Sequence, residues 1–106
     1  MRFQLVAAVL LVLASQARAD DLTVPLTVRD AGFVPPQITT PKGAKVRLEV
    51  TNETAAAIEF ESFELNRERV VQPGQKVAVY LSGLEPGRYE FFDDFHPERK
   101  GVLVVE

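Results

Sequence analysis

The segment Asp93-Asp94-Phe95-His96-Pro97-Glu98 contains most of the residues that could do chemistry. It places three carboxylates and the only histidine of the 106-residue chain within six positions. Carboxylates held this close repel one another, which raises the proton affinity of some of them unless a cation compensates. Carboxylates with one imidazole suit Fe or Mn, and they can also hold Cu(II) or Zn. The segment is therefore a candidate metal site.

The alternative is that basic side chains neutralise these acids and the segment is a solvated loop. Four basic residues are available for that purpose, namely Arg67, Arg69, Arg99 and Lys100. A second acidic stretch contains Glu59, Glu61, Glu64 and Glu68. Alternating glutamates of this kind are typical of the solvent-facing side of a strand.

The elements that must position these residues are strands. Val46, Leu48 and Val50 alternate with charged residues, the pattern of a half-buried strand, and turn residues separate several similar runs. Pro25 cannot donate to a ladder and predicts an edge strand. Gly87 followed by Tyr89 fits a tyrosine corner, which ties a Greek-key crossover. We expect an all-β Greek-key sandwich of seven or eight strands.

The first 19 residues have the features of a signal peptide. Arg2 precedes the apolar run Leu5 to Leu13, which is too short to span a membrane, and Ala17-Arg18-Ala19 resembles a cleavage site. We expect cleavage after Ala19, a single domain over residues 20–106, and a periplasmic location in a bacterium.

Composition narrows the function classes. Residues 20–106 carry 10 basic and 15 acidic residues, a net charge of −5, which argues against a nucleic-acid partner. No cysteine is present, so no disulfide can reinforce the domain. Ser62 and Ser82 lack a nucleophile-elbow context, and no glycine-rich phosphate loop occurs, so we expect no hydrolase activity.

A set of segments spread along the chain resembles cupredoxin domains. These segments include Phe33-Val34-Pro35, Pro41-Lys42-Gly43, Glu59-Phe60-Glu61-Ser62, Gly87-Arg88-Tyr89-Glu90-Phe91-Phe92 and Phe95-His96-Pro97. Their order and spacing look like the cupredoxin-like domain of EfeO-type proteins of bacterial iron uptake and of small periplasmic relatives. The resemblance covers residues 33–106 and implies a cupredoxin-like sandwich.

The chain departs from the blue-copper pattern of two histidines, one cysteine and an axial methionine. Ile58 stands at the first histidine, Asp93 at the cysteine, and Arg99 and Lys100 near the methionine, so only His96 remains. We therefore expect no type 1 copper.

The resemblance implies a periplasmic accessory protein that binds Fe or Cu and presents it to an inner-membrane iron permease. Asp93 and His96 are the main ligands expected, with Glu61, Asp94 and Glu98 as further candidates. Strand register decides whether Glu59 or Glu61 faces the site. The alternative is a metal-free interaction module that docks onto a transporter component, with Asp93 and Asp94 paired to arginines. We expect no enzyme activity, because a ferroxidase would need a second site to receive the electron.

Overall fold

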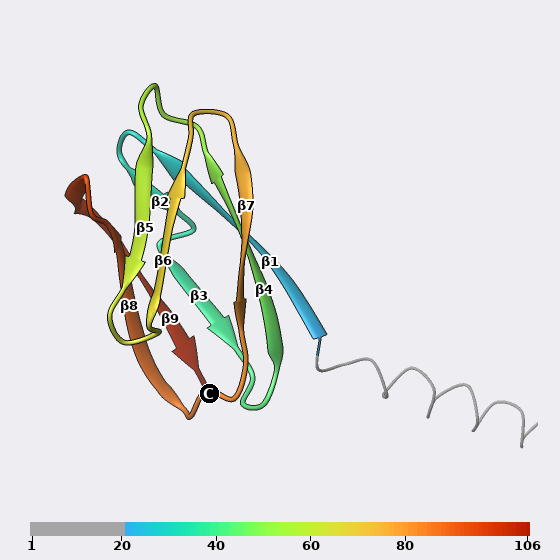
Figure 1. Cartoon of the computed structure of the whole chain (residues 1–106). Coiled ribbons are helices and arrows are strands. Elements are labelled where there is room, and N and C mark those ends of the chain that lie inside the picture. The colour runs from blue at the N-terminus through green and yellow to red at the C-terminus, as the bar shows by residue number, and fades with distance from the viewer. Residues whose placement is uncertain (1–20) are drawn as a thin grey trace, which may run out of the picture.

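A computed structural model describes residues 21–106, which form two facing β-sheets (Figure 1). The predicted signal peptide and its cleavage site lie outside the described residues. Within residues 21–106, no helix has the length and hydropathy needed to cross a membrane. The nine strands are β1 (Asp21–Arg29), β2 (Gly32–Val34), β3 (Gln37–Thr40), β4 (Lys45–Asn52), β5 (Ile58–Ser62), β6 (Arg67–Val71), β7 (Lys76–Leu81), β8 (Gly87–Asp93) and β9 (His96–Val105).

The predicted all-β sandwich is confirmed, with nine strands rather than seven or eight. One sheet has the order β2-β1-β4-β7 and the other the order β3-β9-β8-β5-β6. The extra strand arises where the chain between residues 33 and 40 divides into β2 and β3 on either side of Pro35-Pro36. These two short strands join different sheets.

β1 pairs along its length with β4 in parallel, whereas β2 pairs only with Thr27, Val28 and Arg29. At Pro25, β1 therefore has β4 on one side and no described strand on the other. The prediction of an edge strand is wrong, because β1 lies between β2 and β4, but the short β2 does not reach Pro25 and leaves that residue without a second neighbouring strand.

Alternation places the core between the sheets. On β4, Val46, Leu48 and Val50 are buried, while Lys45 and Arg47 are exposed. The predicted tyrosine corner is confirmed, because the Tyr89 hydroxyl donates to the Glu85 carbonyl at 2.6 Å.

Three phenylalanines fill the core beneath the acidic residues. Phe60 and Phe91 are fully buried and their rings stack at 5.4 Å, and Phe33 meets Phe91 edge-on at 5.0 Å. A Cβ built on Gly101 would lie 2.6 Å from the Phe91 ring, so only glycine fits there without displacing the ring. This packing fixes β5, β8 and β9 relative to one another.

Candidate functional site

The candidate site forms where the turn of the β8–β9 hairpin meets β5. Asp93 pairs with His96 across the hairpin and with Phe60 across the sheet. The backbone N–H of Asp94 donates to the carbonyl of Glu59 at 2.9 Å. Side chains alternate between the two faces of a strand, so Asp93 and Asp94 lie on opposite faces: Asp93 is fully buried and Asp94 is exposed.

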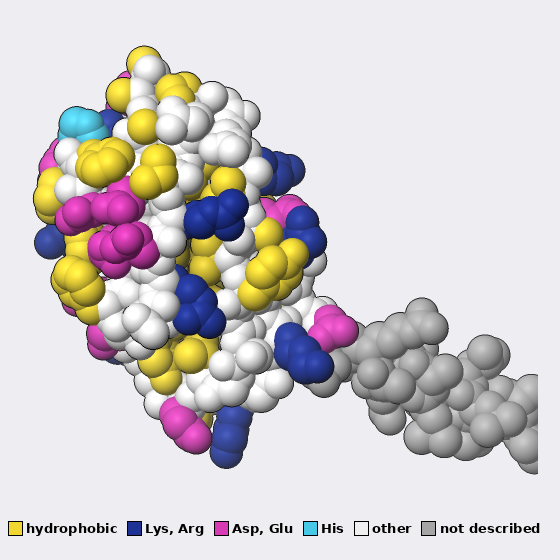
Figure 2. Space-filling view, viewed as in Figure 1, with side chains coloured by type: hydrophobic (Ala, Val, Ile, Leu, Met, Phe, Trp, Pro, Cys, Tyr) yellow, Lys and Arg dark blue, Asp and Glu magenta, His cyan; other side chains and the backbone are white. Residues whose placement is uncertain are grey.

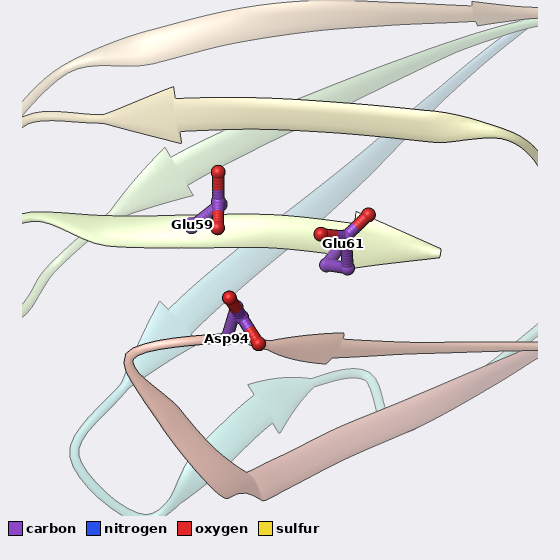
Figure 3. Close-up of side chains that lie close together, drawn as sticks. All are labelled: Glu59, Glu61 and Asp94. Carbon is purple, nitrogen blue, oxygen red and sulfur yellow. The ribbon is translucent and has the colours of Figure 1, made fainter. Parts of the chain in front are cut away.

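Three carboxylates gather on the outer face of the five-stranded sheet. Glu59 and Glu61 are two residues apart on β5 and therefore share a face. Asp94 reaches the same place from the end of β8, as Figure 3 shows. One carboxylate oxygen from each residue lies within 4.8 Å of the others, close enough for one ion to bind all three. We call Glu59, Glu61 and Asp94 the outer acidic cluster.

The outer acidic cluster is electrostatically unbalanced. Burial raises the pKa of the Glu59 carboxyl above 4.5, and the negative charges of Glu68, Asp94 and Asp93 raise it further. Burial also raises the pKa of Glu61, which is 8% exposed, and the adjacent Glu68 carboxyl adds to that shift. Glu61 and Glu68 are directly opposed on β5 and β6, an arrangement of like charges that destabilises a sheet.

The nearby arginines of β6 do not neutralise this cluster. Arg67 donates to the carbonyls of Tyr80, Leu65 and Asn66. Arg69 donates to the carbonyl of Ala78. Among the described residues, none of the ion pairs includes a member of the outer acidic cluster. Its charge is therefore left without a basic partner from this part of the chain.

Asp93 has the opposite environment. Its Oδ1 accepts hydrogen bonds from the backbone N–H groups of Glu59 and Phe95, each at 3.0 Å. Its Oδ2 accepts a hydrogen bond from Arg99 Nη1 at 3.1 Å. No buried side-chain nitrogen or oxygen within residues 21–106 lacks a hydrogen-bond partner. Both oxygens of Asp93 are thus occupied by donors from the protein.

His96 and Glu98 lie apart from the outer acidic cluster. Both side chains are exposed, and His96 Nδ1 is 3.6 Å from Glu98 Oε2. Of the five ligands predicted from the sequence, the structure brings together Glu61 and Asp94 and does not add Asp93, His96 or Glu98 to them. Metal binding by any of the five stays a prediction. Both Glu59 and Glu61 lie in the outer acidic cluster, so strand register does not select one of them. Their two-residue spacing on one strand already indicated that they share a face.

Exposed apolar side chains border the same face. Val70 lies opposite Glu59 on β6 and is 45% exposed. Phe63 is 77% exposed, and its ring contacts that of Phe92 with centroids 5.4 Å apart. On the side of the molecule drawn in Figure 2, acidic side chains gather beside hydrophobic ones.

Of the positions expected for blue-copper ligands, Asp93 lies near Arg99 and the backbone beside Ile58, but these side chains do not fit copper. Asp93 contacts the backbone beside Ile58, and Arg99 contacts Asp93. A blue-copper site needs two imidazoles and a thiolate. Here Ile58 is apolar, Arg99 is cationic, and Asp93 already has an ion-pair partner, so the residues present do not fit type 1 copper.

Solved structures with the same fold support the resemblance in architecture. A purple cupredoxin from Nitrosopumilus maritimus has a TM-score of 0.63 at 18% identity, covering 78% of this chain and 99% of that one. The metal-binding domain of a Cu(I)-exporting P-type ATPase of Streptococcus pneumoniae D39, solved with Cu(I), has a TM-score of 0.72 at 16% identity, covering 84% and 89%. At these identities the likeness shows the fold alone.

Comparisons of sequence identify the family. An uncharacterized protein of Rickettsia prowazekii (strain Madrid E) is 40% identical over 85 residues, which are 79% of this chain and 68% of that protein. The family model of the cupredoxin-like domain matches residues 2–105. The chain therefore belongs to the cupredoxin-like domain family.

Proposed function

We propose that this chain is a periplasmic metal-binding accessory protein of an iron-uptake system. It holds an iron ion at the outer acidic cluster and presents it to an inner-membrane permease, without performing chemistry on the ion. Copper is the second ion that this proposal allows. The function differs from electron transfer at a blue-copper centre, for which the residues do not fit.

The observation that carries the proposal is the convergence of three carboxylates that lack a basic partner among the described residues. Their ligand atoms lie within 4.8 Å of one another. Glu59 and Glu61 have raised pKa values because they are partly buried and face other carboxylates. A bound cation would remove this repulsion, so binding and folding would favour each other.

The ligand chemistry favours a hard ion. The outer acidic cluster offers carboxylate oxygens only, which suit hard cations better than soft Cu(I). Asp94 is exposed, so the ion would keep contact with solvent and remain exchangeable. Exchangeable binding suits a protein that passes an ion on.

Two resemblances support iron or a related metal. The sequence resembles the cupredoxin-like domain of EfeO-type iron-uptake proteins, which supports iron. The Streptococcus pneumoniae domain of the same fold was solved with Cu(I), which shows that this fold can hold a metal ion in another protein.

A second candidate function is a metal-free interaction module that docks onto a transporter component. One observation favours it, since Asp93 is paired with Arg99, as that alternative requires, whereas Asp94, which it also pairs with an arginine, has no ion pair among the described residues. The exposed Phe63 and Val70 beside the acidic residues would then form the contact surface.

Metal titration of the chelator-treated protein separates the two functions. Calorimetry with Fe(II), Fe(III), Mn(II), Cu(II) and Zn(II) would measure affinity and stoichiometry. The test variant is Glu59→Gln/Glu61→Gln/Asp94→Asn. The matched control is Asp21→Asn/Glu85→Gln/Glu106→Gln, which removes the same number of charges from exposed positions outside the cluster.

We expect one iron ion per chain in the native protein and in the control variant, and loss of that binding in the test variant. Equal loss in both variants would mean that binding depends on overall charge, which contradicts the proposal. Absence of binding to every ion would favour the interaction module instead.

A further inference from the structure

Arg99 provides the chain with a buried cation. Its side chain is 10% exposed, and its Nη1 lies 3.1 Å from Asp93 Oδ2. Breaking a buried ion pair is strongly destabilising, because the remaining charge has no partner. The pair therefore fixes the hairpin end of β9 against the end of β8.

The same guanidinium also contacts the turn between β1 and β2. Arg99 Nε donates to the carbonyl of Asp30 at 3.2 Å, and Nη2 lies 3.7 Å from Asp30 Oδ1. Three oxygens from two separate segments thus lie near one positive group, one of them on the exposed Asp30 side chain. An arrangement of oxygens from different segments around one charge is also how proteins bind hard metal ions.

The location of the Arg99–Asp93 ion pair distinguishes it from an ordinary salt bridge. By the resemblance to cupredoxins, Asp93 stands at the thiolate position and Arg99 near the axial methionine. The pairing register shifts between Phe92, which faces Lys100, and Asp93, which faces His96. Arg99 lies in the intervening stretch of β9, and its side chain is directed to Asp93 rather than to solvent.

We propose that the Arg99 guanidinium supplies the positive charge at the position where blue-copper cupredoxins hold their metal. In the native chain this position is closed to metal ions. Without the guanidinium, the oxygens of Asp93 and Asp30 form a latent site for a hard divalent cation. The inference uses residues outside the outer acidic cluster and stands independently of the proposed function.

The decisive experiment measures whether a metal can replace the guanidinium. The background is Glu59→Gln/Glu61→Gln/Asp94→Asn, which removes the outer acidic cluster. Arg99→Ala is added to this background, and thermal unfolding is followed with and without millimolar Mn(II). We expect Mn(II) to raise the unfolding temperature of the Arg99→Ala variant and to leave the background protein unchanged.

Two outcomes of that experiment would overturn the inference. One is an unfolding temperature of the Arg99→Ala variant that does not respond to Mn(II). The other is an equal response in the background protein, which would show that the ion binds elsewhere. Adding Asp93→Asn to the Arg99→Ala variant is the control, and it should abolish the Mn(II) response.

A double-mutant cycle keeps the inference testable if Arg99→Ala does not fold even with Mn(II). It compares the native protein with Asp93→Asn, Arg99→Met and the double variant by urea unfolding. We expect Arg99→Met to lower the folding equilibrium constant in both backgrounds. The decrease should be about tenfold larger in the protein with Asp93 than in the Asp93→Asn variant. Equal losses in both backgrounds would show that Arg99 does not compensate Asp93.

Discussion

Asp93 and Asp94 are adjacent in the sequence, yet their carboxylates have opposite surroundings. Asp93 points into the sandwich, where Arg99 and two backbone N–H groups occupy both of its oxygens. Asp94 points outward and joins Glu59 and Glu61, which also lack a basic partner among the described residues. The residue type is the same, so the difference comes from the face of the strand and from the presence of an internal cation.

The comparison shows what makes a carboxylate available to a metal ion. A carboxylate that already has a cation stabilises the fold and would have to lose that partner before it could bind an ion. Carboxylates that repel one another are in the opposite state, because a bound ion relieves the repulsion. Sequence proximity to His96 indicated Asp93 as a ligand, whereas its environment favours a structural role.

Replacing Asp93 should have the largest effect on stability. Asp93→Ala leaves the Arg99 guanidinium without its carboxylate and two backbone N–H groups without their acceptor. We expect a loss of about 3–5 kcal/mol in the free energy of unfolding, measured with urea. Metal stoichiometry measured under conditions where the variant is folded should be unchanged. A loss of metal binding in the folded variant would return Asp93 to the role of ligand.

Gly101→Ala should destabilise the protein by an intermediate amount without changing any charge. The new methyl group would lie 2.6 Å from the Phe91 ring and 2.9 Å from the Pro36 carbonyl oxygen. Overpacking of this kind costs about 1–3 kcal/mol, measurable by urea unfolding. Metal affinity of the folded variant should equal that of the native protein, and a parallel loss would mean that binding follows stability rather than the outer acidic cluster.

Neutralising part of the outer acidic cluster should act in the opposite direction on stability. Glu59→Gln/Glu61→Gln removes two carboxylates whose burial and repulsion by neighbouring carboxylates raise both pKa values, so the metal-free variant should unfold at a higher temperature than the native protein. Calorimetry should show weaker metal binding by the same variant. Glu85→Gln, at an exposed position outside the cluster, should change neither quantity; a similar gain in that control would assign the effect to net charge.

The pH dependence of metal affinity should give the smallest effect. Because the pKa values of Glu59 and Glu61 lie above 4.5, protons compete for these carboxylates at a higher pH than they do for ordinary glutamates. The destabilisation that these groups cause is present at neutral pH and is lost as the pH falls through their raised pKa values towards 4.5, because the folded carboxyls take up protons first. Affinity measured between pH 7 and 4.5 should therefore fall before the protein loses its fold. An affinity that is constant over this range would contradict ligation by these two residues.

Several features of the fold could be predicted from residue patterns because each depends on local alternation. β4 is an example. The Tyr89 corner follows instead from the spacing of Gly87 and Tyr89. Strand partners could not be predicted, since the parallel pairs β1–β4 and β3–β9 have the same alternating pattern as antiparallel ones. For the same reason, alternation does not reveal that residues 32–40 divide between two sheets.

In the candidate site, alternation predicts which face a side chain is on but not which side chain it contacts. Asp93 shares the inward parity of Phe91, and Arg99 shares that of Leu103, so alternation indicates that both face the core. Their contact at 3.1 Å depends on the register shift between β8 and β9, which alternation does not reveal. Glu59 and Glu61 needed no register to be placed together, because residues two apart on a strand always share a face.

The place of β9 in its sheet has a consequence for the stage at which the chain can fold. β9 lies between β3 and β8, so residues 96–105 provide the pairing partner of Gln37–Thr40 and of β8. A chain in which these residues are not yet available lacks the strand that joins β3 to β8. Arg99 is in the same stretch, so Asp93 also remains without its cation until then. Nearly all of residues 21–105 must therefore be available before the sandwich can close.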